Sequence, residues 1–269
     1  MASDSFLAIR GLGKTFAAKR WWGGERGGTV ALRDVTLGLE KGRTLGLVGP
    51  SGSGKSTLAR CLAFYEAPSS GEVWLDGQNL WSLGRQERRA MRAQIQLIFQ
   101  EPAASLNPRF TAGEIIEEPL VIQKWGSAQT RLQKACELME TVGLPSQAAG
   151  RAALAFSGGE RQRLSIARAL ALQPKLLILD ESFSGLDLSV QAQVANLLLD
   201  LQKRLGLTYI LISHDFGVVA SLADEIAVMD NGCLVEHAAT ADVVAKPRHS
   251  RTKELLEASL ALSLGGALA

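Results

Sequence analysis

The segment GPSGSGKST at residues 49–57 places a lysine and two hydroxyl side chains directly after a run of glycines. It matches G-x-x-x-x-G-K-[ST], follows an apolar run typical of a strand and begins a helical segment. Glycines let the backbone wrap closely around phosphates with its amides pointing inward. The order of strand, loop and helix disfavours the alternative of a purely structural glycine-rich turn. We expect Lys55 to reach the β- and γ-phosphates of a nucleotide, Ser56 to ligate Mg²⁺ and Thr57 to bond the α-phosphate.

A second run, LLILDE, ends an apolar segment with the neighbouring carboxylates Asp180 and Glu181. A buried strand delivers such residues to the ligand-binding edge of an open α/β sheet. We expect Asp180 to hold Mg²⁺, directly or through water, and Glu181 to polarise an attacking water. The alternative is a pair of solvated carboxylates at a strand end, which the nearby phosphate motif disfavours.

Two further apolar runs end in polar residues, Gln100 after LIF and His214 after YILIS. A glutamine is able to ligate a metal and orient a water, and a histidine is able to donate to a γ-phosphate. Each is weak alone, because an isolated histidine is more often structural. Strands ending at 48, 99, 180 and 213 would bring these groups to one edge.

A third motif, FSGGERQR at residues 156–163, begins a strongly helical run. Ser157 is suited to cap the helix, and Gly158 and Gly159 leave its first amides bare. A helix start of this kind attracts anions. The chain thus carries a second potential anion-binding turn about a hundred residues after the first.

The elements expected to position these groups alternate in type. Nearly continuous apolar runs predict buried strands at 44–48, 95–99, 176–180, 208–213 and 225–229. Helical stretches are expected at about 55–64, 160–172, 188–205 and 215–222, which is the α/β pattern. The more alternating N-terminal runs predict an antiparallel β layer, and residues 111–148 predict a helical subdomain inserted into the core.

Composition sets few limits on function. The net charge of +2 gives no argument for nucleic acid, and we expect RQERRAMR at 85–92 to be a solvated helix face. The cysteines Cys61, Cys136 and Cys233 lack metal or disulfide spacing. No apolar run approaches the roughly 18 residues of a membrane span, and the first residues show no signal-peptide pattern, so we expect any membrane role to act through a partner.

Together these motifs resemble the nucleotide-binding subunit of an ABC transporter over about residues 6–237. GPSGSGKST resembles Walker A, LLILDE Walker B, FSGGERQR the family signature, SGLD at 184–187 the D-loop, Gln100 the Q-loop and His214 the switch histidine. The resemblance implies a P-loop NTPase fold with an N-terminal antiparallel β subdomain, and ATP hydrolysis with Mg²⁺. It places ATP on Phe16, Gly49, Pro50, Ser51, Gly52, Ser53, Gly54, Lys55, Ser56 and Thr57, with Mg²⁺ on Ser56, Gln100 and Asp180.

The resemblance also implies a dimer. Two subunits, the second being either the same chain or a paralogue, would pair head-to-tail, with each ATP between the P-loop of one and the signature turn of the other. The residues concerned are Ser157, Gly158, Gly159 and Glu160 in the turn and Ser184, Gly185, Leu186 and Asp187 in the D-loop. The catalytic residues implied are Glu181, His214 and Gln100.

Other segments resemble the peptide and nickel importer branch, including FQEPAASLNPRFTAGEIIEEPL, SVQAQVANLL and the tail RHSRTKELL. The branch implies import driven through membrane permease subunits docked near Gln100, an extracytoplasmic solute-binding protein that selects the solute, and a peripheral location on the cytoplasmic face of the inner membrane. The sequence departs from the family at Phe156 and Ser182, and from the usual His-Pro-Tyr-Thr of the tail at Ser250 and Arg251.

We expect an ATPase domain over 1–236, with the helical subdomain at about 100–156, and a helical tail over 237–269. One alternative is a soluble ABC-type ATPase acting on ribosomes or DNA, which the single P-loop and the lack of a long heptad region disfavour. Another is a binding module without hydrolysis, which Lys55, Asp180, Glu181 and His214 disfavour. No nucleic-acid partner is expected.

Overall fold

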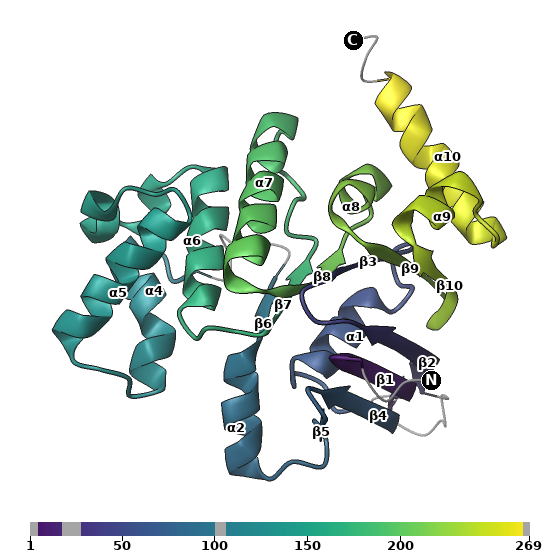
Figure 1. The fold of residues 1–269 in the computed structure, drawn as a ribbon, viewed down its shortest axis with the longest axis horizontal. Helices are drawn as coiled ribbons and strands as arrows, with labels where there is room; N and C mark the ends of the chain where they lie inside the picture. Colours follow the sequence, from purple (N-terminus) through teal and green to yellow (C-terminus); the bar gives the residue numbers. More distant parts are fainter. Residues whose placement is uncertain (1–4, 18–27, 100–105, 266–269) are drawn as a thin grey trace, which may run out of the picture. The chain divides into compact units, whose positions relative to one another are not determined.

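A computed structural model describes residues 5–17, 28–99 and 106–265 (Figure 1). The chain forms two compact units, one of residues 1–92 with 208–269 and the other of residues 93–207. Each unit is described below in turn. Within the described residues, no helix combines the length and the apolar character needed to cross a membrane.

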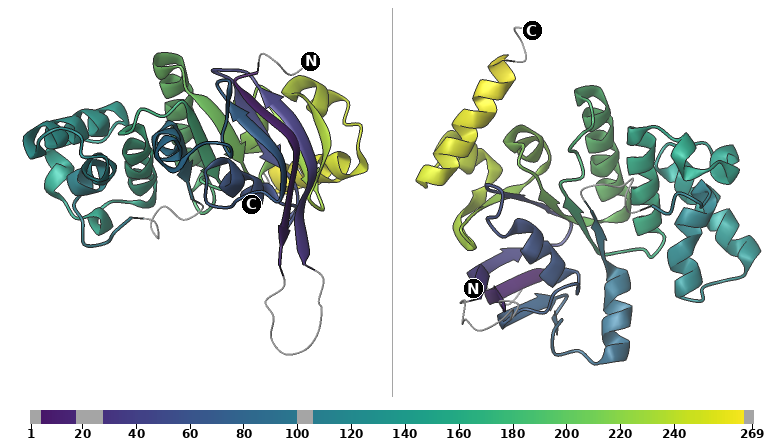
Figure 2. Two further views of the ribbon diagram at one scale, coloured as in Figure 1. Left: turned by 90° about the horizontal axis from the view of Figure 1, so that it is seen from below. Right: turned by 180° about the vertical axis from the view of Figure 1, so that it is seen from behind.

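The first unit contains an antiparallel sheet in the strand order β2-β1-β4-β5. Its strands are β1 (Leu7–Phe16), β2 (Thr29–Leu39), β4 (Ser70–Leu75) and β5 (Gln78–Asn79). Figure 2 (left) shows β1 and β2 as a long antiparallel pair. The alternating pattern of the N-terminal runs correctly predicts this layer, whereas β4 and β5 were not predicted.

A second sheet of the same unit carries parallel strands. Strand β3 (Thr44–Val48) pairs in parallel with β8 (Thr208–Ile212) and with β9 (Glu225–Asp230). Every residue of β3 and β8 is buried, which explains their continuous apolar sequence. Strand β10 (Cys233–Ala239), which was not predicted, pairs antiparallel with β9.

The helices of the first unit follow its strands. The helices predicted one by one are α1 (Lys55–Leu62) and α8 (Phe216–Leu222), and α9 (Thr240–Ala245) and α10 (Ser250–Gly265) lie within the range expected to be a helical tail. Helix α2 (Arg85–Gln94) buries only Met91. Two of its arginines lie over aromatic rings of the first unit, with the Arg88 guanidinium 5.4 Å from the Trp81 centroid.

The second unit contains two parallel strands and a group of helices. Strand β6 (Ile95–Ile98) pairs with β7 (Leu176–Asp180), so that Ile95 lies opposite Leu176. Helices α6 (Gly158–Leu170) and α7 (Leu188–Leu205) lie close to their predicted positions. The predicted helical subdomain contains α4 (Ala112–Ile122), α5 (Ala128–Thr141) and the short 3₁₀ helices η1 (Ser146–Gly150) and η2 (Ala153–Ala155). The teal part of Figure 2 (right) shows α4 and α5 beside α6.

The two kinds of sheet and the helical group confirm the predicted fold class. The division into a domain over 1–236 and a tail over 237–269 stays a prediction. The residue at which that tail begins lies inside β10, so this strand joins the predicted domain to the predicted tail.

Candidate functional site

The glycines of residues 49–54 are required by close packing in the first unit. Gly49 has φ of 153°, and a Cβ there would lie 2.2 Å from the carbonyl oxygen of Met229. Gly54, the N-cap of α1, has φ of 105°, and its Cβ would lie 2.6 Å from the Ala31 carbonyl oxygen. An L side chain fits neither position, so the loop is held tightly between β2 and the end of β9.

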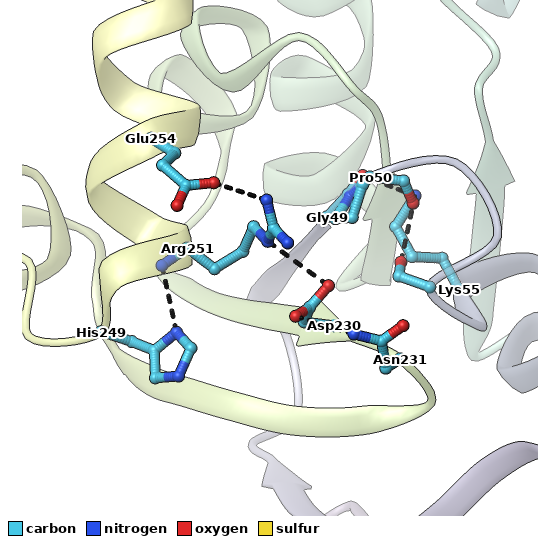
Figure 3. Close-up of polar contacts among 9 residues, drawn as sticks. Gly49, Pro50, Lys55, Asp230, Asn231, His249, Arg251 and Glu254 are labelled. Atoms are coloured by element: carbon cyan, nitrogen blue, oxygen red, sulfur yellow. Dashed lines mark hydrogen bonds and ion pairs between the residues drawn. The ribbon is translucent and has the colours of Figure 1, made fainter.

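Lys55 lies inside this loop. Its side chain is 5% exposed, and its Nζ donates to the carbonyl oxygens of Gly49 at 2.7 Å and Pro50 at 2.9 Å, and to Ser53 Oγ at 3.4 Å (Figure 3). A buried ammonium surrounded by a glycine-rich backbone is a strong attractor for phosphate oxygens. Ser56 and Thr57 follow Lys55 in the first turn of α1 and are half-buried.

The turn between β9 and β10 forms one wall of the loop, a contact that sequence reasoning missed. The Gly232 amide donates to the Ser53 carbonyl at 3.0 Å, and the Gly232 carbonyl accepts from the Arg33 amide at 2.8 Å. Asn231 and Gly232 have φ of 48° and 82°, as a two-residue hairpin turn requires. The Asn-Gly pair was a sequence signal for this turn, but nothing in the sequence connects the turn to Ser53.

Two other predicted residues lie in the first unit. Phe16 ends β1 and is half-buried, and the Lys14 ammonium lies 4.7 Å from its ring centroid. His214 follows β8 and is exposed, and the next residue, Asp215, caps α8 by accepting from the Gly217 and Val218 amides. Phe16 therefore lies at the end of β1, and His214 lies shortly after the end of β8.

The two predicted carboxylates lie in the second unit at the end of β7. Asp180 is 6% exposed. Glu181 adopts φ of 48°, which is uncommon for a residue with a side chain and marks local strain. The turn that follows stabilises this conformation, because Ser184 Oγ donates to the Glu181 carbonyl at 2.7 Å. Ser182, where the sequence departs from the family, is buried and donates to the Ile98 carbonyl at 3.5 Å.

The signature turn in the second unit is a capping box. Ser157 Oγ accepts from the Glu160 amide at 3.3 Å, and the Glu160 carboxylate accepts from the Ser157 amide at 2.7 Å. The hydrogen bond from the Ser157 amide lowers the pKa of Glu160. The role of Ser157 as a cap is thus confirmed. A Cβ on Gly159 would lie 2.5 Å from Val190 Cγ1 of α7, whereas one on Gly158 would meet only Leu186 at 3.7 Å.

The residues around the signature turn explain two further positions. Phe156 is 3% exposed, and the Arg151 guanidinium lies 4.5 Å from its ring centroid. The aromatic ring is therefore buried directly before the turn. In the D-loop, Asp187 caps α7 by accepting from the Val190 amide at 2.9 Å, and this hydrogen bond lowers its pKa. Asp187 thus has a structural role, independent of any partner.

The predicted site residues are divided between the units. The P-loop, Phe16 and His214 belong to the first unit, and Asp180, Glu181 and the signature turn belong to the second. Gln100 lies outside the described residues. Among the residues described, no cluster of three or more His, Cys, Asp or Glu is arranged as a metal site. A hydroxyl and a carboxylate suit Mg²⁺, which typically takes one or two protein ligands plus phosphate oxygens.

A model of the ABC transporter family matches residues 32–184. The chain is 45% identical to the dipeptide transport ATP-binding protein DppF of Haemophilus influenzae, over 94% of this chain and 77% of that protein. It is 43% identical to a putative peptide import ATP-binding protein of Brucella ovis, over 96% and 80% of the two chains.

Two solved structures support the fold. The dimeric ATP-binding cassette MJ0796, in a post-hydrolysis state with ADP and Pi, superposes with a TM-score of 0.75 at 29% identity, covering 87% of this chain and 98% of that one. The cbiO1 structure from Clostridium perfringens has a TM-score of 0.78 at 24% identity, with 91% and 92% covered, and shows the fold alone. The chain therefore belongs to the ABC transporter family and is an ATP hydrolase with the P-loop fold of its ATP-binding cassettes.

Proposed function

We propose that the chain binds ATP with its P-loop, residues 49–57. The observation that carries this proposal is the buried Lys55 ammonium among the carbonyls of Gly49 and Pro50, at the start of α1. The amides of the loop and of the first helical turn would bind the phosphates, and Lys55 would move from the loop carbonyls to the β- and γ-phosphates. Phe16 would stack on the adenine.

For hydrolysis, we propose that Glu181 orients and deprotonates the attacking water and that His214 contacts the γ-phosphate. Magnesium, held by Ser56 and Asp180 with Gln100, would neutralise charge on the phosphate oxygens. Phosphoryl transfer depends chiefly on positioning and electrostatics. The strained φ of Glu181, stabilised by Ser184, supports a positioned rather than a freely moving carboxylate.

The signature turn would complete the ATP site of a second subunit. Apart from the Glu160 amide, which donates to Ser157 Oγ, the first amides of α6 have no partner within the helix and would be available to an anion. The capping box positions the start of α6 rigidly. Two ATP would then join two subunits, and hydrolysis would release them. The dimeric state of the cassette MJ0796 supports pairing of this kind.

The pairing is tested by Gly158→Asp. The position is exposed, and a Cβ there would meet only Leu186 Cδ2, at 3.7 Å, so the variant is expected to fold. A carboxylate there would repel the γ-phosphate across the dimer, abolishing hydrolysis while leaving ATP binding to the isolated chain intact. A loss of ATP affinity in the isolated chain would show instead that the turn belongs to the chain's own site.

We further propose that ATP turnover drives a membrane importer for peptides, with the chain bound peripherally to permease subunits on the cytoplasmic face and an external binding protein selecting the solute. The relatives named for dipeptide transport and peptide import support this solute class. Nickel, the other solute predicted, gains no support from these relatives, and no observation favours an action on ribosomes or DNA.

The experiment is uptake into vesicles carrying the chain together with the membrane proteins that copurify with it. We expect ATP-dependent uptake of a labelled dipeptide and none of nickel. Lys55→Ala should abolish uptake, and Lys41→Ala, at an exposed turn, is the matched control that should not. Nickel uptake without peptide uptake would overturn the proposed solute, and equal uptake by both lysine variants would overturn the coupling to ATP.

A further inference from the structure

The C-terminal helix α10 is connected to the β9–β10 turn by an ion pair. Arg251 Nε lies 3.4 Å from Asp230 Oδ1, and the same guanidinium contacts the Glu254 carboxylate (Figure 3). Asp230 also accepts from the Asn231 side chain at 3.1 Å.

The start of α10 is fixed independently of this pair. The Glu236 carboxylate on β10 accepts from the backbone amides of Arg248 and His249, both at 2.9 Å, and from Thr252 Oγ1 at 2.6 Å. Thr252 is completely buried. These contacts hold the first turn of the helix against β10, so the direction in which Arg251 extends is set by the fold rather than by its own ion pair.

Asp230 connects this helix to the P-loop. It lies between Met229, whose carbonyl packs against Gly49, and the turn in which the Gly232 amide donates to the Ser53 carbonyl at 3.0 Å. A displacement of Asp230 would therefore act, within two residues of the chain, on the contacts to Gly49 and to Ser53. The rigid hairpin, with positive φ at Asn231 and Gly232, leaves little freedom to absorb such a displacement.

We propose that Arg251 is a positioning residue for ATP binding: it fixes Asp230, and through the β9–β10 turn it holds the P-loop in its phosphate-binding shape. The inference rests on the proposed nucleotide site at Lys55. It assigns a role in the ATP site to α10, which lies outside the nucleotide-binding motifs of the sequence. The role is assigned to Arg251 because its guanidinium pairs with Asp230. Lys253, which lies on the same turn of the helix, is exposed.

The expected size of the effect follows from the exposure of the pair. The Arg251 and Asp230 side chains are 36% and 18% exposed, so solvent screens part of their attraction. Ion pairs of this kind have coupling energies that correspond to a change of about two- to fivefold in an equilibrium constant. Removing Arg251 should therefore raise the dissociation constant for ATP about two- to fivefold, with a smaller change in kcat.

The experiment measures MgATP binding to the full-length chain by isothermal titration calorimetry. Arg251→Ala and Asp230→Asn should each weaken binding, and the double variant should bind no more weakly than either alone, because one contact is lost in all three. Arg251→Lys, which keeps the charge, should bind closer to wild type than Arg251→Ala. Lys253→Ala is the matched control and should bind as wild type does.

Unchanged affinity in folded Arg251→Ala would overturn the inference, as would equal weakening by Lys253→Ala or additive effects of the Arg251 and Asp230 substitutions. A lower melting temperature with unchanged affinity would also overturn it, because that result describes a merely structural contact. Lys55→Ala separates the two proposals. If it binds ATP like wild type, the nucleotide site itself is wrong, and if it loses binding while Arg251→Ala does not, only the role of Arg251 is wrong.

Discussion

Alanine at Gly158 and at Gly159 should have opposite effects on stability, although the two residues are neighbours in the signature turn. Both lie in the first turn of α6, where alanine is a better helix former than glycine by up to about 1 kcal/mol. The difference lies in what a Cβ meets: Leu186 Cδ2 at 3.7 Å for Gly158, but Val190 Cγ1 at 2.5 Å for Gly159.

The magnitude follows from that second contact. A separation of 2.5 Å is far below van der Waals contact, and the β-branched Val190 has one strongly preferred rotamer in a helix, so α6 or α7 must shift. Overpacking of this kind costs about 1–3 kcal/mol. Because the propensity gain is shared, Gly159→Ala should be less stable than Gly158→Ala by about that same 1–3 kcal/mol.

Urea denaturation of the full-length variants, followed by circular dichroism, measures this difference. Val190→Ala should relieve the contact, so that adding it to Gly159→Ala costs less than adding it to wild type. Equal stability of the two glycine variants, or strictly additive effects with Val190→Ala, would refute the packing account of the second glycine.

Three further outcomes are expected. Gly49→Ala places a side chain at φ of 153° and 2.2 Å from the Met229 carbonyl, so it should lose at least about 1–3 kcal/mol of unfolding free energy, measured by denaturation, and bind ATP weakly in calorimetry. Burial of Glu236 opposes its ionisation, but the hydrogen bonds that the carboxylate accepts outweigh burial and lower its pKa below 4.5. The stabilising contribution of Glu236 is therefore complete above pH 4.5 and is lost as the pH falls through the lower pKa of the folded state. The stability gap between wild type and Glu236→Gln should therefore stay constant above about pH 5 and shrink as the pH is lowered below 4.5 in urea titrations, and a gap that stays constant below pH 4.5 would contradict the shift. Arg151→Met should lower stability by about 0.5–1 kcal/mol through loss of its contact with Phe156, whereas Arg151→Lys should retain part of it.

The parts of the fold that were predicted are those with a strong local pattern. The continuous apolar run of β3 and the period of α7 indicate a buried strand and a helix whose bounds agree with the structure. Strands β4 and β10 were not predicted, because their half-exposed residues give neither a continuous nor a clearly alternating pattern. Pairing with neighbours distant in sequence determines such strands.

For the site, the sequence predicts the glycine loop and the cap at Ser157, because each depends on residues close together in the chain. It does not predict the contacts that support them. The hydrogen bond from Gly232 to Ser53 and the ion pair between Asp230 and Arg251 depend on how separate strands and the last helix pack together. The buried position of Phe156 likewise depends on its packing, including the Arg151 guanidinium against its ring, which the sequence does not predict.

The most direct test of the central claim compares phosphate release from MgATP by the wild-type chain and by Glu181→Gln, purified with the partner subunits. The account predicts ATP-dependent phosphate release by the wild type, and a loss of at least about a hundredfold in the variant, with ATP binding retained in a trapped dimer. Steady-state hydrolysis by Glu181→Gln at the wild-type rate would contradict the account.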